Sequence, residues 1–302
     1  MAYSKVPVLI MAFNRPTHVK KAMQAIREYQ PERLYLACDG PRADKEGERQ
    51  LVADTRKTME DSVDWPCELK TLFRENNLGC AQAVYGAISW FFENEDYGVI
   101  IEDDVIVGQD FFRLCEYLLP RYANEGRVME ISAQNHSFRH DIDNTYEYSQ
   151  CFQMWGWASW RRAWKKMDIK MAQRKYLSIV YLIKRLGVFR GCMMQYYFML
   201  IKRNIDAAST WDTQWYWSIL VNDGLVIVPG VNLAINIGMD GGSHYEMGDK
   251  NPYADLKIGK IEWPLVYNDS LEIDSVQKRY DSQDFFNVRM IGLKKKLKRL
   301  FQ

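Results

Sequence analysis

Three consecutive acids, Glu102, Asp103 and Asp104, follow the apolar run of residues 97 to 101 and precede a second apolar run. Carboxylates gathered at the end of a buried strand need compensation, because uncompensated like charges in a low dielectric cost several kcal/mol or take up protons. A divalent cation would supply that compensation. Oxygen ligands favour Mg²⁺ or Mn²⁺, which commonly bridge protein carboxylates to substrate phosphates. An exposed acidic turn is the alternative that this stretch alone leaves open.

A second candidate is Asp212, in the stretch STWDTQWYW. The flanking Trp211 and Trp215 would partly desolvate its carboxylate and make it more basic, as a general base requires. Alternatively, Asp212 caps the helix expected over residues 213 to 224, because aspartate is a favourable N-cap residue. The two roles are compatible.

The first hundred residues alternate between strand and helix patterns, which predicts βαβ units and an α/β fold with a mainly parallel central sheet. Strands are expected over 6–13, 33–40, 67–75 and 97–104, and helices over 15–29, 45–60 and 79–95. Parallel sheets bind ligands beyond the carboxyl ends of their strands. The polar residues expected there are Asn14 and Arg15, Asp39 and Gly40, and the acidic triplet.

The second half is more elaborate. We expect helices over 111–122, 172–204 and 213–224, an aromatic-dense stretch over 151–167, and a strand pair or bent strand over 225–238. No repeat, low-complexity tract or interdomain linker appears. A single domain over residues 1–285 is the simplest interpretation.

Composition narrows the class of protein. The net charge of +1 over 302 residues gives no field that favours nucleic acid as a partner. Six cysteines without a C-x-x-C pair indicate reduced thiols and a cytoplasmic protein. No stretch approaches the roughly 18 apolar residues of a membrane span.

The C-terminal tail, residues 286–302, carries six basic residues and no acid, with apolar residues at helical spacing. It is predicted to form a basic amphipathic helix that holds the protein peripherally at the anionic inner face of the plasma membrane. A solvated, frayed tail is the alternative.

An ordered series of motifs over residues 6 to 247 resembles the GT-A glycosyltransferases, in particular N-acetylglucosaminyltransferase I and its bacterial relatives. The motifs are VPVLIMAFNRPTHVKKAM, ERLYLACDG, VIIEDDVIVGQDFF, MWGWASWRRAW, TWDTQW and GGSHY. The resemblance implies a Rossmann-like GT-A fold, with a nucleotide-sugar-binding half at 1–112 and an acceptor-binding half at 113–285. The stretch NLGCAQAV departs from the pattern expected around the nucleobase.

For the donor side, the resemblance implies that Asp104 ligates Mn²⁺ or Mg²⁺ while Glu102 and Asp103 face the sugar and ribose. Arg15 would bind the diphosphate, where a guanidinium can be bidentate. Asp39 would accept a hydrogen bond from the nucleobase. From the residues alone, Arg15 could instead be a surface charge at a helix start, and Asp39 a turn residue before Gly40.

For the acceptor side, Asp212 matches the base of an inverting displacement in the resembling family. Ser243 and His244 would lie near the phosphates, in a mobile loop that closes over the donor. Alternatively, His244 would be a further metal ligand. An ordinary surface loop is the alternative. Trp155, Trp157 and Trp211 are candidates for stacking on an acceptor sugar, although core packing is the more common role of such tryptophans.

These inferences predict an inverting, metal-dependent glycosyltransferase that uses a UDP-sugar, with UDP-GlcNAc as one candidate. The acceptor would be a glycan or lipid-linked glycan of bacterial surface polysaccharide synthesis. A sugar nucleotidyltransferase is a second enzyme class, but its glycine-rich phosphate loop is missing from MAFNRPTH. A non-catalytic carbohydrate-binding module would leave the acidic triplet without a role.

Overall fold

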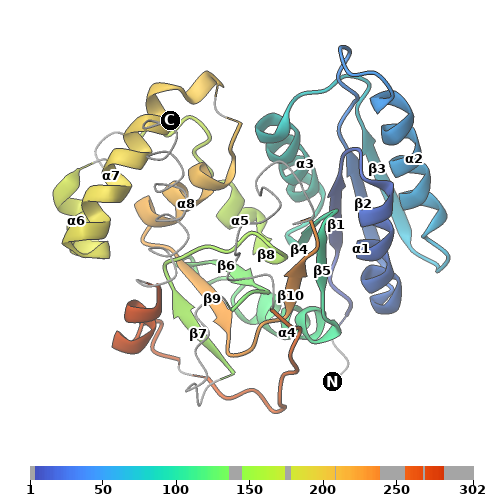
Figure 1. The fold of residues 1–302 in the computed structure, drawn as a ribbon. Coiled ribbons are helices and arrows are strands. Elements are labelled where there is room, and N and C mark those ends of the chain that lie inside the picture. Colours follow the sequence, from blue (N-terminus) through green and yellow to red (C-terminus); the bar gives the residue numbers. More distant parts are fainter. Residues whose placement is uncertain are drawn as a thin grey trace.

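The computed structural model describes residues 4–135, 145–173, 178–207, 209–238, 256–267 and 269–281. Its centre is a large mixed sheet with the strand order β3-β2-β1-β4-β8-β6-β9-β7 (Figure 1). The first four members of that order are parallel, and they are β1 (Val8–Ala12), β2 (Arg33–Cys38), β3 (Glu68–Phe73) and β4 (Tyr97–Glu102). The protein therefore has a mixed α/β fold, as the alternating sequence pattern predicted.

The central strands are covered on both faces. Val8, Leu9 and Ile10 of β1 are fully buried, which explains why this strand reads as a continuous apolar run and not as an alternating one. The edge strand β3 is more exposed, and its Lys70 pairs with Glu68 of the same strand. Charged side chains on an edge strand discourage pairing with another chain.

Helices cover the two faces of this half. On one face, α1 (Pro16–Tyr29) contacts α2 (Glu48–Asp61) and α4 (Gln109–Arg121), with Tyr29 stacked on Phe112 at 4.2 Å between ring centroids. On the other face, α3 (Cys80–Asn94) contacts α5 (Arg161–Trp164) through Phe92 and Trp164. These rings form part of one continuous hydrophobic core.

The strand order reverses between β1 and β4. The chain moves outward from β1 to β2 and β3, and then returns through α3 to place β4 on the other side of β1. Open α/β sheets bind ligands at such a reversal, beyond the carboxyl ends of the strands, because the flanking connections diverge there. The acidic triplet lies at the end of β4, so the topology places it at this point.

The second half departs from a purely parallel sheet. β8 (Trp157–Trp160) is antiparallel to both β4 and β6 (Val128–Ser132), β9 (Leu225–Pro229) is parallel to β6, and β7 (Tyr146–Ser149) is antiparallel to β9. A second small sheet pairs β5 (Val105–Val107) with β10 (Ala234–Asn236). The expected pair of strands over 225–238 is therefore present as β9 and β10, in different sheets.

The long helical segment expected over 172–204 is two helices. α6 (Ile179–Leu186) ends at Gly187, whose φ of 82° breaks the helix, and α7 (Val188–Arg203) begins directly after it. The two helices pack closely, because a Cβ atom on Gly191 would lie 2.6 Å from the backbone nitrogen of Ile183. The short helix η2 (Ile205–Ala207) follows, and α8 (Asp212–Val221) packs against the pair.

Candidate active site

The ends of β1 and β4 are joined directly. Met11 pairs with Glu102 in the sheet, and just beyond them the backbone N–H of Phe13 donates to Oδ2 of Asp103 at 3.3 Å. Arg15 follows at the start of α1, where Pro16 occupies the first helical position. Arg15 and the acidic triplet, predicted from separate strand ends, are therefore brought together.

Asp104 is held between two parts of the chain. Arg15 Nη1 lies 3.2 Å from its Oδ2, and Asn236 Nδ2 donates to its Oδ1 at 3.3 Å. The backbone after β10 closes over the carboxylate, because Ile237 N donates to the Asp104 carbonyl at 2.8 Å and Gly238 leaves no room for a side chain. Both side-chain contacts of Asp104 lie at the long end of the hydrogen-bond range.

The carboxylates of the triplet are difficult to ionise together. Burial, and then the charges of Asp104 and Asp103, raise the pKa of Glu102 to about 8. Burial and the charge of Asp104 raise the pKa of Asp103 to about 7, against the opposing effect of Arg15. Oε1 of Glu102 is buried and has no hydrogen-bond partner within the described ranges. The site is thus built to gain from an added cation.

Asp212 faces this cluster from the other half of the protein. It is the first residue of α8, where its Oδ1 accepts from the backbone N–H of Thr213 at 2.8 Å. Its negative charge contributes to the raised pKa of Glu102, so the two carboxylates lie within electrostatic reach of each other. The side chain is half-buried, and it is Trp211, not Asp212, that occupies the N-cap position.

Cys80 is a neighbour that the sequence interpretation missed. It begins α3, directly after Gly79. Desolvation raises the pKa of the Cys80 thiol to about 11, although the residue as a whole is exposed, and the charges of Glu102 and Asp212 add to the rise. Its position after the end of β3 was the available signal, because that strand end borders the same edge of the sheet.

Hydrogen bonds within the protein occupy most of the carboxylate of Asp39, which follows β2. Its carboxylate accepts from the backbone N–H of Leu78 at 3.0 and 3.2 Å and from Asn77 Nδ2 at 3.0 Å. Burial raises its pKa, and the hydrogen bonds of this loop oppose that rise. Backbone N–H groups of Gly40 and Gly79 also act on this carboxylate, so the protein itself occupies most of its roughly four acceptor positions. Its predicted contact with a nucleobase stays a prediction.

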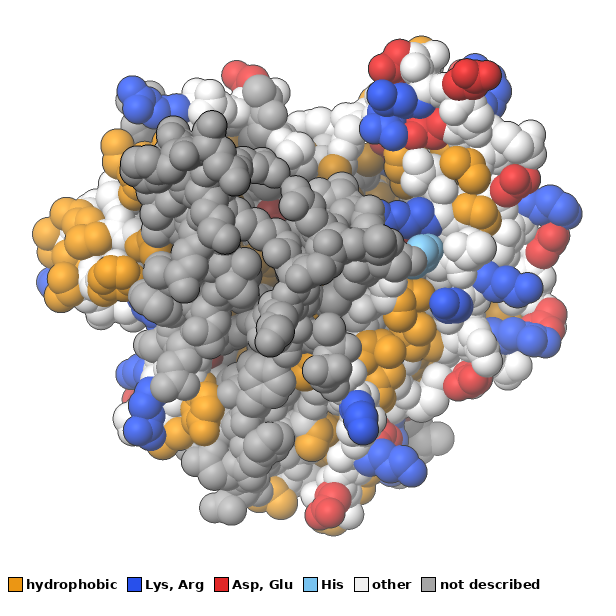
Figure 2. All heavy atoms as spheres, in the orientation of Figure 1, with side chains coloured by type: hydrophobic (Ala, Val, Ile, Leu, Met, Phe, Trp, Pro, Cys, Tyr) orange, Lys and Arg blue, Asp and Glu red, His pale blue; other side chains and the backbone are white. Residues whose placement is uncertain are grey.

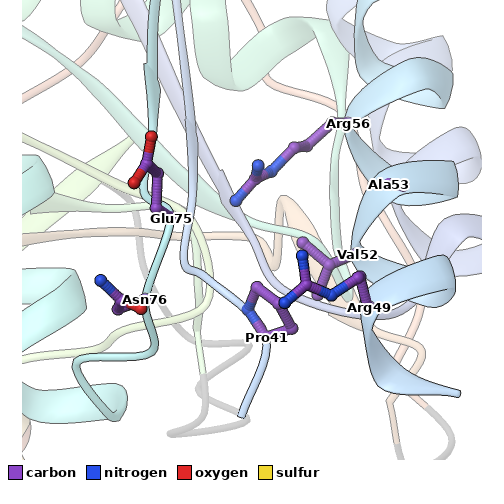
Figure 3. A pocket seen from close by; sticks show the side chains of 7 residues that line it. All are labelled: Pro41, Arg49, Val52, Ala53, Arg56, Glu75 and Asn76. Carbon is purple, nitrogen blue, oxygen red and sulfur yellow. The ribbon is translucent and has the colours of Figure 1, made fainter. Parts of the chain in front are cut away.

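A pocket of about 420 Å³ opens beyond Asp39 between α2 and the segment that follows β3 (Figure 3). Arg49 and Arg56 reach toward it from α2, and Glu75 and Asn76 border it from the opposite side. Arg56 Nη2 also donates to the carbonyl of Asp39 at 3.2 Å. The sequence interpretation did not identify this pocket, and the acidic triplet is not part of its lining.

Two of the three tryptophans proposed for the acceptor are core residues. Trp157 is 1% exposed and Trp211 is 4% exposed, and their rings stack on each other with centroids 5.8 Å apart. Trp164 and Trp215 complete this cluster. The expectation that Trp157 and Trp211 stack on a sugar is therefore wrong for this conformation, because neither ring has a free face. Trp155 is partly exposed and remains a candidate.

Glu130 is a buried acid that the sequence interpretation overlooked. Its carboxylate accepts from Trp215 Nε1 at 2.8 Å and from the backbone N–H of Gln153 at 2.9 Å. The residue is fully buried, and burial raises its pKa to about 8. It thereby connects β6 to α8, the helix that begins at Asp212. A single acid within the apolar strand sequence VMEIS was the available signal.

Other predicted features lie outside the described residues, namely Ser243, His244 and the tail at 286–302. Within the described ranges, no three His, Cys, Asp or Glu side chains come together as a potential metal-binding group. In the same ranges no helix combines the length and apolar character needed to cross a bilayer.

No protein-family model and no curated protein matches this chain. Solved structures do match, among them the crystal structure of HddC from Yersinia pseudotuberculosis. That match has 10% sequence identity and a TM-score of 0.31, and it covers 52% of this chain and 77% of the HddC chain.

Proposed function

We propose that this protein is an inverting, metal-dependent glycosyltransferase of the GT-A type. The observation that supports the proposal most strongly is that Arg15 and Asp104, from separate strand ends, form an ion pair at the strand-order reversal, with Asp212 from the other half of the chain close enough for its charge to raise the pKa of Glu102. One side of this site offers carboxylates and Arg15 for a diphosphate and its cation. The other side offers a half-buried carboxylate that can take a proton.

The carboxylates of the site are suited to a cation that the substrate also helps to bind. The buried, unpartnered Oε1 of Glu102 and the long contacts of Asp104 favour an added positive charge. The described residues supply no cage of three ligands. Mg²⁺ and Mn²⁺ often bind through one or two carboxylates, with substrate phosphates and water completing the shell. Asp104 would be the direct ligand, and the cation would neutralise charge on the departing diphosphate.

In the proposed reaction, Asp212 accepts the proton of an acceptor hydroxyl while that oxygen forms a bond to the anomeric carbon of the donor. The bond from the anomeric carbon to the phosphate oxygen breaks, and the nucleoside diphosphate leaves with the bonding electrons. A single displacement of this kind inverts the anomeric configuration. Arg15 can stabilise the charge that develops on the diphosphate, because its guanidinium already lies beside Asp104.

UDP is the proposed nucleotide, with Asp39 as a contact for the base and a glycan or lipid-linked glycan as the acceptor. Asp39 lies at the neighbouring strand end, and the pocket bordered by Arg56 and Asn76 opens beyond it. Glu102 and Asp103 would face the sugar and ribose. Trp155 would contact the acceptor, and Ser243 and His244 the phosphates.

The function is tested by incubating the protein with MnCl₂ and a panel of nucleotide-sugars, and measuring the products by anion-exchange chromatography. Slow release of UDP from one donor, accelerated by a glycan acceptor, is expected. Pyrophosphate exchange without release of a nucleoside diphosphate would show a nucleotidyltransferase instead. Calorimetry then tests the metal site, because Asp104→Ala should abolish the Mn²⁺-dependent part of UDP binding. Unchanged affinity would reject Asp104 as a ligand.

A further inference from the structure

The helix pair α6 and α7 lies at one end of the molecule, against α8 and away from the central sheet (Figure 1). Its inner side is well packed. Leu182, Met194 and Phe198 are buried against Trp217, and together with α8 they form a small core of their own. The pair is thus attached to the rest of the protein through its inner side.

The outer side of this pair is apolar. Val188 is 68% exposed, Phe189 is 60% exposed and Tyr196 is 64% exposed, and Met199 continues the row along α7. Ile179 and Val180 add exposed apolar area on α6. Figure 2 shows hydrophobic side chains gathered at the left end of the molecule, where α6 and α7 lie in Figure 1. A helix that is apolar on both its inner and outer sides normally has a partner on each.

The segment that contains α6 and α7 is basic. Residues 169 to 205 contain eight basic side chains and no acid. Some of these cations are used within the protein, since Arg185 pairs with Asp223 and Lys170 pairs with Asp206. Lys184 near the end of α6 and Arg203 at the end of α7 are exposed. The outer surface therefore combines apolar side chains with positive charge.

We propose that the outer surface of α6 and α7 docks on an anionic lipid bilayer. Exposed apolar side chains flanked by Lys and Arg are the features with which interfacial helices enter the headgroup region. A second copy of this chain is a poorer partner, because a symmetric dimer would oppose two positive surfaces. The site does not depend on the C-terminal tail, whose own membrane contact remains a separate prediction.

Hydrogen bonds connect the helix pair α6 and α7 to α8, the helix that begins at Asp212. Tyr197 of α7 lies with its hydroxyl 3.2 Å from the Thr213 hydroxyl, and Thr213 is adjacent to Asp212. Tyr181 of α6 donates to the carbonyl of Leu220 at the other end of α8. If the proposed function holds, this arrangement would present the acceptor side to lipid-linked glycans. Membrane docking itself does not rest on that function.

The test is co-sedimentation of the full chain with vesicles of phosphatidylcholine alone or of equimolar phosphatidylcholine and phosphatidylglycerol. We expect binding to the anionic vesicles, weakened by salt. The double variant Val188→Ser/Phe189→Ser should lower the partition coefficient about tenfold or more, because two side chains lose apolar burial. Lys184→Gln/Arg203→Gln should lower it by a similar factor.

Matched controls come from the opposite end of the molecule. Leu51→Ser removes an exposed apolar side chain from α2, and Lys20→Gln/Lys21→Gln removes two exposed charges from α1. Both should bind vesicles as the unmodified protein does. Hydrogen exchange should show protection of residues 188 to 203 only when anionic vesicles are present. Melting curves confirm that each variant is folded.

Three results would overturn the inference. Unchanged partition of both helix-pair variants would place any membrane contact elsewhere, for example in the tail. Equal binding to neutral and anionic vesicles would show that charge does not contribute to docking. Concentration-dependent dimerisation that is lost in Val188→Ser/Phe189→Ser, without vesicle binding, would identify a second copy as the partner. Because none of these measurements uses turnover, their failure is distinct from failure of the proposed function.

Discussion

A Cβ atom on Gly238 would lie 2.2 Å from Oδ2 of Asp104, so the backbone after β10 defines one wall of the proposed cation site. Gly238→Ala should push the Asp104 carboxylate away from Arg15 and from any bound cation. We expect transfer to fall about a hundredfold, since small displacements of positioning groups are costly. The melting temperature should change little. Gly126→Ala is the matched control, because a Cβ atom there meets nothing within 4 Å.

Asp212→Asn tests the proposed base. Removing the proton acceptor should slow transfer by about 10²- to 10⁴-fold, as is typical of general bases. UDP affinity measured by calorimetry should change far less than turnover, because Asp212 is proposed to act on the acceptor. Asparagine keeps an oxygen that can accept from Thr213 N, so the helix start should survive. Substantial retained turnover would identify Asp212 as a structural residue only. Asp206→Asn, an exposed acid on η2, is the control.

The first half of the fold could be predicted because its signals are local. Strands β1, β2 and β4 are short, mainly apolar runs, and the helices have an apolar periodicity of their own and begin at or directly after residues such as Pro16 and Gly79. The reversed strand β8 could not be predicted in this way. Its position depends on pairing between Val99 and Ala158, which are far apart in the chain and carry no matching sequence signal.

The candidate site was predictable to a similar degree. The rule that ligands bind at strand ends was enough to group Arg15 with the triplet, which the ion pair to Asp104 bears out. Residue type alone could not show which face a side chain occupies. Trp157 was therefore assigned to a ligand although it is buried, and Glu130 was missed although it supports α8.

Stability should depend on pH through the acidic triplet. Burial and neighbouring carboxylates raise the pKa of Glu102 from 4.5 to about 8 and that of Asp103 from 3.8 to about 7. The folded protein therefore holds these protons more tightly than the unfolded chain does. Consequently the free energy of unfolding should fall as pH rises from about 4 to about 8, where the unfolded carboxylates are ionised and the folded ones are not.

The same titration predicts how ligands stabilise the protein. A cation with UDP requires ionised carboxylates, so Mn²⁺ and UDP should raise the melting temperature more at pH 8 than at pH 6. Thermal melts by circular dichroism at the two pH values measure this difference. In Glu102→Gln, which cannot ionise at that position, the difference should shrink. Equal ligand-induced shifts at both pH values in the unmodified protein would contradict the prediction.

Glu130 is predicted to position α8. Its two oxygens satisfy two donors, Trp215 Nε1 and the backbone N–H of Gln153. Glutamine offers one oxygen and one NH₂ group, so Glu130→Gln leaves a buried donor facing another donor, at a cost of about 1–3 kcal/mol in the free energy of unfolding. Because Trp215 lies in the first turn of the helix that begins at Asp212, kcat should fall while the KM for the donor is retained.

A double-mutant cycle separates this role from general destabilisation. Trp215→Phe removes the indole donor that Glu130 accepts, while a ring remains in the tryptophan cluster. If Glu130 acts through Trp215, the effects of Glu130→Gln and Trp215→Phe on kcat should be smaller together than their sum, because both remove the same hydrogen bond. Independent, additive effects would mean that Glu130 supports the fold without positioning Asp212. Glu130→Asp, which keeps both acceptors on a shorter side chain, should recover part of the activity lost in Glu130→Gln.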